Sequence, residues 1–433
     1  MNRRILQLAV PNIISNVTVP LLGAVDLALM GHLDNKVYIG AVALGSMIFN
    51  FIYWGFGFLR MSTSGFVAQE FGRRNFAQVM INLARPLTLA FSAGLLLIIL
   101  QFPVSSIAFW LVDSGQEVET YARQYFHIRI YAAPATIALY ALTGWFIGMQ
   151  NTRIPMIIAV CVNMANIILS LVFVRWLGMH SEGVALGTLL AQYTGLLLAL
   201  FLLHRYYGRF FRFYDGRIFW NSLALSRFFS VNRDIFIRTL CLIAALSFFT
   251  AKSASMGDTL LAVNSLLLQF FMFFSYLVDG YAHAAEALTG RFTGSGNRGA
   301  LRTAVRYLFA WGGGIAVLFT IVYLLWAEAI LGLMTSNPEV LSASEPYLFW
   351  IVLIPIISFS AFIWDGIFIG ATASVQMRNS MLISTVLIYF PVYYLSLPFL
   401  GNNSLWLALI LFLFSRGVSL GLMAPGAILK KKA

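Results

Sequence analysis

Twelve apolar stretches, each roughly 20 residues or longer, constrain the fold of this chain more than any other feature. They lie at about 5–30, 37–60, 78–102, 124–148, 154–176, 183–203, 235–251, 259–285, 303–326, 347–371, 381–399 and 404–424. Only 10% of the 433 residues are charged, whereas soluble domains contain about 25% charged residues. The sequence therefore predicts an all-α polytopic membrane protein with twelve transmembrane helices.

The formal net charge of +12 is also consistent with nucleic-acid binding, so the placement of the basic residues matters. Arg73, Arg153, Arg205 and the run 430–432 all fall on the cytoplasmic side if both termini are cytoplasmic. Cytoplasmic loops of membrane proteins carry an excess of Lys and Arg. We therefore expect an integral inner-membrane protein whose basic residues meet membrane lipids, not nucleic acid.

Short motifs repeat at a constant separation along the chain. "GWFIG" begins at Gly144 and "GIFIG" begins at Gly366, so the shift is 366 − 144 = 222. "GRRN" at 72–75 and "GSGN" at 294–297 are separated by the same shift. The repeat predicts two lobes of six helices related by a pseudo-twofold axis along the membrane normal.

The longest polar stretch separates the two predicted halves and sets the expected domain boundaries. We expect residues 1–208 to form an N-lobe with helices 1–6, and residues 227–433 to form a C-lobe with helices 7–12. Residues 209–226 alternate basic and aromatic side chains. That pattern is typical of an amphipathic linker at the cytoplasmic membrane surface.

Two six-helix lobes favour a secondary transporter. The sequence has no G-x-x-x-x-G-K-[ST] phosphate loop, so we expect transport that runs on an ion gradient or simply downhill, with no enzymatic activity and no cofactor. A lipid-linked precursor flippase is one alternative, but it calls for a strongly cationic cavity, whereas Arg60 is accompanied here by several carboxylates. A non-transporting scaffold is the other, but it has no use for isolated carboxylates such as Asp26 and Asp365 within spans.

Asp26 lies in the first apolar stretch, where an ionised carboxylate costs about 2.5–3.5 kcal/mol on insertion scales. Pro11 and Pro20 precede it, and each removes a helical hydrogen bond and permits a bend. We expect Asp26 to exist in both protonation states near neutral pH. The structural alternative is a carboxylate that is hydrogen-bonded to neighbouring amides and never titrates.

Polar residues in the fifth and sixth spans are the candidate partners of Asp26. Asn163, Asn166 and Ser170 are spaced by three and four residues, which places them on one helical face. Thr188 in the next span is a further candidate. Polar side chains in membrane helices also hold helices together, but this stripe favours a polar pocket.

The second half has its own candidates: Asp234, Asp279, Glu286 and Asp365. Asp279 and Glu286 are separated by seven residues, which places them on one helical face. Arg60 aligns near Asp279 with a shift of 219, so we hypothesise an Arg60–Asp279 ion pair. The alternative is that this pair is only a structural latch.

The stretches "AVPNIISNVTVPLLGAVDLALMGHL", "GFGFLRMSTSGFVAQEFGRRN", "NRDIFIR", "DGYAHAAEAL" and "WDGIFIGA" together resemble the DinF-like branch of the MATE (multidrug and toxic compound extrusion) transporters. The resemblance covers essentially the whole chain. It implies a V-shaped exporter of cationic or amphipathic small molecules in exchange for H+ or Na+, and we expect a monomer. By the same resemblance, Asp26 matches the cation-binding aspartate of the first helix, and Pro11 matches the proline at which that helix bends.

Asn166 and Thr188 match polar residues of the same pocket, but Ser170 replaces a second aspartate found in many relatives. A pocket with one carboxylate favours H+ over Na+, because Na+ needs several oxygens that carry enough negative charge. Asp26, Asn163, Asn166, Ser170 and Thr188 together still offer oxygens to Na+. The seventh-helix glutamate of other branches is also missing, so we expect coupling through the N-lobe.

Overall fold

The computed structural model describes residues 1–31, 36–112 and 115–429, and every regular element in them is a helix. Contacts group the chain into two compact units. Residues 14–227 form the first unit, and residues 1–13 pack with residues 228 onward in the second. Helix α1 (Asn2–Gly31) runs through Pro11 and Pro20, and it passes from one unit to the other between Ile13 and Ile14.

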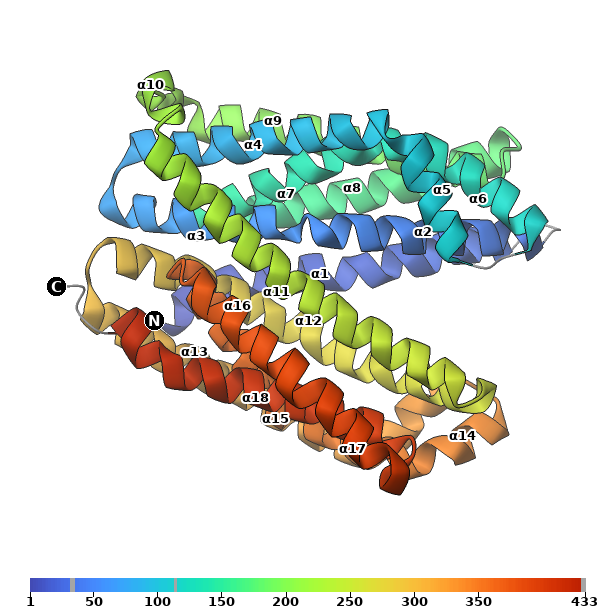
Figure 1. Cartoon of the computed structure of the whole chain (residues 1–433). Coiled ribbons are helices and arrows are strands. Elements are labelled where there is room, and N and C mark those ends of the chain that lie inside the picture. Colours follow the sequence, from blue (N-terminus) through green and yellow to red (C-terminus); the bar gives the residue numbers. More distant parts are fainter. Residues whose placement is uncertain (32–35, 113–114, 430–433) are drawn as a thin grey trace. The chain divides into compact units, whose positions relative to one another are not determined.

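The first unit is built from the second part of α1 and nine further helices. These helices are α2 (Lys36–Gly55), α3 (Gly57–Arg73), α4 (Phe76–Ile99), α5 (Gln101–Leu111), α6 (Gln116–Arg129), α7 (Ala133–Gly148), α8 (Arg153–Leu171), α9 (Ser181–Tyr207) and α10 (Gly216–Phe219). Helix α7 is its buried centre: it contacts α3, α4 and α9 (Figure 1). Its residues are almost all apolar or small, as a helix enclosed on several sides requires.

The second unit continues from α11 (Ser222–Ser255), which begins just before the boundary. Its other helices are α12 (Asp258–Gly294), α13 (Arg298–Met334), α14 (Pro338–Ser344), α15 (Leu348–Gly370), α16 (Ser374–Leu382), α17 (Phe390–Leu400) and α18 (Asn403–Ala424). Helix α15 packs between α12, α13 and α18 (Figure 1). It is the counterpart of α7 at the centre of this unit.

The described residues contain 11 helical segments that are long and apolar enough to cross a membrane. Each predicted span from the second onward overlaps one of them, and α1 covers the first. Several predicted ends are too early. The helix predicted at 37–60 continues through α3 to Arg73, the one predicted at 259–285 continues to Gly294, and the one predicted at 303–326 continues to Met334. In α3 the extension is polar but small, and Ser62, Thr63 and Ser64 are buried. Small side chains let neighbouring helices pack closely there.

The 222-residue sequence repeat is matched by a repeated contact between helices. A β-carbon on Gly144 would lie 2.3 Å from the carbonyl oxygen of Arg60, and one on Gly366 would lie 2.2 Å from that of Ala282. Ala282 follows Arg60 by 282 − 60 = 222 residues. The α3–α7 and α12–α15 crossings are therefore the same close contact, made twice.

The turns repeat in the same way. Arg74 and Gly296 both adopt positive φ angles, 59° and 69°, after α3 and α12. Each is followed by an asparagine, Asn75 or Asn297, whose side chain accepts a hydrogen bond from the backbone three residues later. Such N-caps satisfy amide groups that the first turn of a helix leaves open. The shift is again 296 − 74 = 222.

Replacing Gly366 by alanine is expected to destabilise the second unit by about 1–3 kcal/mol, because the new β-carbon would collide with backbone and not with a flexible side chain. The melting temperature of the purified protein in detergent measures the effect. Gly314→Ala is the matched control: Gly314 lies within α13, and a β-carbon there meets nothing within 4 Å. Equal melting temperatures for the two variants would contradict the tight crossing.

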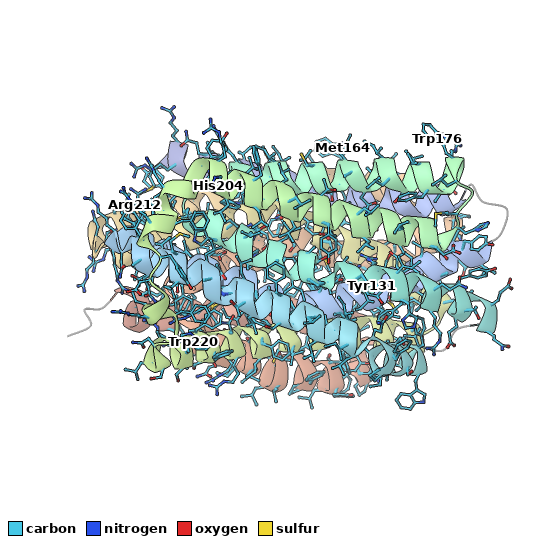
Figure 2. All side chains as sticks on the ribbon, turned by 90° about the horizontal axis from the view of Figure 1, so that it is seen from above. Tyr131, Met164, Trp176, His204, Arg212 and Trp220 are labelled. Carbon is cyan, nitrogen blue, oxygen red and sulfur yellow. The ribbon has the colours of Figure 1, made fainter. Side chains whose placement is uncertain are left out.

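The segment predicted as a linker is anchored to α4. Arg85 is buried and donates hydrogen bonds to the carbonyl oxygens of Ile218, at 2.7 Å, and Phe219, at 2.8 and 3.0 Å. Trp220 in the same segment is 76% exposed, and Figure 2 labels it together with Arg212. The role of this segment at a membrane surface stays a prediction.

Candidate coupling site and buried charges

Asp26 lies in α1, in the part of that helix that belongs to the first unit. Its side chain lies outside the described part of the structure. Binding of Na+ at Asp26 therefore stays a prediction. Among the described residues, no group of three or more His, Cys, Asp or Glu side chains is arranged to hold a metal ion.

Three of the predicted partners of Asp26 are joined by hydrogen bonds. The Asn166 side-chain amide donates to Thr188 Oγ1 at 2.9 Å, and the Ser170 hydroxyl donates to Asn166 Oδ1 at 3.3 Å. Thr188 in turn donates to the carbonyl oxygen of Val184 at 2.9 Å. All three side chains are at most 6% exposed. The result is a buried polar chain that links α8 to α9.

Asn163 lies one turn before Asn166 on α8. Its Nδ2 atom is buried and has no hydrogen-bond partner among the described residues. A buried amide donor without an acceptor is unfavourable, and polar groups of this kind are usually satisfied by a partner or by water. The polar face of α8 therefore ends in an amide donor for which the described residues supply no acceptor.

A close contact between α8 and α9 supports this chain of hydrogen bonds. A β-carbon on Gly187 would lie 2.6 Å from Ser170 Oγ and 2.9 Å from its backbone nitrogen. Glycine at this position lets α9 approach α8. The opposite side of α8 is apolar and exposed, as Met164 illustrates at 52% exposure (Figure 2). Helix α8 thus separates a polar inner face from an apolar outer face.

In the second unit, Asp365 is the centre of a buried ion triad. Its Oδ2 atom accepts hydrogen bonds from Arg238 on α11 and, at 2.5 Å, from Arg416 on α18. All three side chains are less than 10% exposed. Asp279 lies close enough to Arg416 to interact with it electrostatically. Two guanidinium groups therefore already neutralise the Asp365 carboxylate.

Asp234 is fully buried and is held by a second set of partners. Arg378 donates to its Oδ1 at 2.7 Å, and Ser374 donates to its Oδ2 at 2.9 Å. Arg233 is a more distant partner at 3.6 Å. Arg238, the other arginine that brackets Asp234 in the sequence, instead binds Asp365.

The remaining candidates lie on α3 and α12. Glu286 is buried at the crossing with Gly370, where a β-carbon on the glycine would lie 2.3 Å from the Glu286 carbonyl oxygen. Arg60 is on α3 in the first unit, and Asp279 is on α12 in the second. Their pairing stays a prediction.

Sequence reasoning missed four cations that the structure places in contacts between segments: Arg85, Arg129, Arg378 and Arg416. The rule that identified Asp26, an ionisable residue in an apolar run, also applies to Arg416 in "LFLFSRGVSLGL". Arg378 gives no such signal, because it follows a polar turn at the start of α16.

Comparison with known proteins gives consistent matches. A sequence model of the MatE family matches residues 11–172 and 236–395, once in each half. DNA damage-inducible protein F of Escherichia coli K12 is 39% identical over 95% of this chain and 90% of that protein. Protein DETOXIFICATION 44, chloroplastic, of Arabidopsis thaliana is 24% identical over 96% of this chain and 80% of its own length. The outward-facing structure of a multidrug resistance MATE family transporter of the MOP superfamily has a TM-score of 0.89 at 19% identity, covering 99% of this chain and 96% of that chain.

Proposed function

Because this chain belongs to the MatE family of membrane transporters, we propose that it exports cationic or amphipathic small molecules in exchange for inward H+, with Na+ as the alternative ion. It is an integral membrane protein of a transporter family, and we propose transport without enzymatic activity. Our proposal places it in the inner membrane with both termini cytoplasmic, working as a monomer with an N-lobe (1–208), a linker (209–226) and a C-lobe (227–433).

The observation that carries the proposal is the buried chain Ser170–Asn166–Thr188 with the open amide of Asn163 beside it. These groups are polar in a unit made of apolar helices, and they can exchange hydrogen-bond partners when a nearby charge changes. We propose that Asp26 is that charge. Ionised Asp26 holds a cationic substrate, and its protonation from outside rearranges the polar chain.

Protonation is coupled to helix bending in this proposal. Pro11 cannot donate a helical hydrogen bond, so bending costs least near it. The division between the two units falls two residues later, between Ile13 and Ile14. A change in α1 near Pro11 thus acts where the helix leaves one unit and enters the other.

The second-half carboxylates support coupling through the first half. Asp365 and Asp234 are each held in ion pairs with arginine side chains, so arginine already balances their charge. We propose structural roles for Asp234 and Asp365. Asp279, Glu286 and Arg60 stay candidates for the polar pathway of the substrate.

Transport by vesicles reconstituted with the purified protein tests the proposal. A panel of cationic dyes is loaded, and pH and Na+ gradients are imposed separately. We expect the pH gradient alone to drive substrate movement against a concentration difference, and a Na+ gradient alone to drive little. Vesicles without protein are the control. Transport that follows neither gradient would contradict ion-coupled export.

A further inference from the structure

Arg129, the last residue of α6, is a half-buried cation with neutral partners. Its guanidinium donates to the Ser46 hydroxyl at 3.1 Å and to the Tyr125 hydroxyl at 2.5 Å. It also lies over the ring of Phe49, 4.9 Å from the ring centre. No carboxylate of the described residues pairs with it, whereas Arg123 on the same helix pairs with Glu119 at 2.7 Å. A guanidinium removed from water in this way calls for a counter-ion.

Among the hydrogen-bond donors in this region, Arg129 Nε has no acceptor in the described part of the chain. The Tyr53 and Thr136 hydroxyls lie next to each other, and even where one donates to the other, the second O–H group finds no acceptor among the described residues. Tyr53 and Thr136 are only 7% and 8% exposed. Buried donors are rarely left unpaired in native proteins. These donors require a hydrogen-bond acceptor. Because the Arg129 cation lies beside them, an acceptor that carries a negative charge is favoured.

These groups come from three helices but lie in one place. Ser46, Phe49 and Tyr53 are spaced by three and four residues on α2, so they share one face. The Tyr53 hydroxyl is close enough to interact with both Arg129 and Thr136. Tyr140, one turn after Thr136 on α7, interacts with Arg129 in the same way. Helices α2 and α6 pack directly against each other.

We propose that this cluster, formed by Ser46, Tyr53, Tyr125, Arg129 and Thr136, binds the anionic group of an amphipathic molecule: a carboxylate or sulfonate on an apolar body. The planar guanidinium matches the two oxygens of such a group. The Tyr53 and Thr136 hydroxyls supply a further donor. The cluster contains no carboxylate and takes no part in the proton mechanism proposed above.

The alternative is that Arg129 only ties α6 to α2 through Ser46 and Tyr125. The two roles make opposite predictions for Tyr53→Phe and Thr136→Val. Both changes leave the Arg129 contacts to Ser46 and Tyr125 in place, so a purely structural role predicts unchanged ligand binding. An anion site predicts weaker binding.

The test is calorimetric binding of 1-naphthoate to the purified full-length protein in detergent, which does not depend on transport. Arg129→Gln is expected to weaken binding about tenfold to hundredfold, and Tyr53→Phe or Thr136→Val about threefold to tenfold. Arg123→Gln, six residues earlier on the same helix, is the matched control and should bind within about twofold of the parent. The cation 1-naphthylmethylammonium should not compete.

Three results would overturn the proposal: no binding of 1-naphthoate, equal binding of the naphthyl cation, or binding that neither Arg129→Gln nor Tyr53→Phe weakens. If Arg129→Gln does not fold, Tyr53→Phe decides, because it leaves the Arg129 contacts to Ser46 and Tyr125 in place. Failure of this binding leaves pH-driven export untouched, and the reverse also holds. The two proposals are therefore tested separately.

Discussion

Replacing Asp365 by alanine is expected to lower the free energy of unfolding by about 3–5 kcal/mol. The change leaves Arg238 and Arg416 buried without the carboxylate that both of them bind. Asp279 also interacts electrostatically with Arg416. Two like charges would then face each other in an apolar unit. We expect the variant to accumulate poorly in membranes and to melt far below the parent.

Tryptophan fluorescence measures this effect while the purified protein is unfolded by increasing concentrations of a denaturing detergent. Glu345→Ala is the control, because Glu345 is an exposed acidic residue at the start of a short helical turn in the same unit. It should change stability by less than about 0.5 kcal/mol. A parent-like Asp365→Ala would show that the triad does not stabilise the fold.

The periodicity of the sequence was sufficient to predict the helices, the repeat and part of the polar site. Apolar runs identify helices because a bilayer requires backbone hydrogen bonds to be satisfied within each segment. Asn166 and Ser170 could be placed together because residues four apart share a helical face. Thr188 was a candidate only as a polar residue in the next span, since nothing in the spacing of one helix predicts which neighbour it contacts.

Contacts between segments that are distant along the chain could not be predicted from the sequence. Asp234 lies next to Arg233, yet its closest arginine is Arg378, 144 residues later. Asp365 binds Arg416, 51 residues later. Charge alone cannot select among several arginines, because the choice depends on which helices pack together. Contacts also group residues 1–13 with residues 228 onward, and no sequence signal marks that boundary, because α1 has no break at Ile13.

Replacing Asp26 by asparagine is expected to abolish pH-driven export while leaving the folded protein in the membrane. Asparagine keeps the size and hydrogen-bonding capacity of the side chain but cannot exchange a proton. A pH gradient supplies about 1.4 kcal/mol per unit, and the membrane potential about 2.3 kcal/mol per charge per 100 mV. Without a proton-carrying group, neither can be used, so the substrate ratio across reconstituted vesicles should fall to about one.

Asp258→Asn is the matched control for this variant. Asp258 is exposed at the first residue of α12 and lies outside the polar chain. The Asp258→Asn variant should transport the substrate at the rate of the parent protein. Parent-like export by Asp26→Asn under the same pH gradient would refute the role of Asp26.

Infrared difference spectroscopy of the folded protein tests the central claim most directly, because the carbonyl stretch of a protonated carboxyl group is separate from that of a carboxylate. Spectra of the parent and of Asp26→Asn are recorded in lipid while the pH is changed across the working range of the transporter. We expect one protonated-carboxyl band that grows as the pH falls in the parent and is missing from the variant. A parent spectrum with no band that depends on Asp26 would contradict the account.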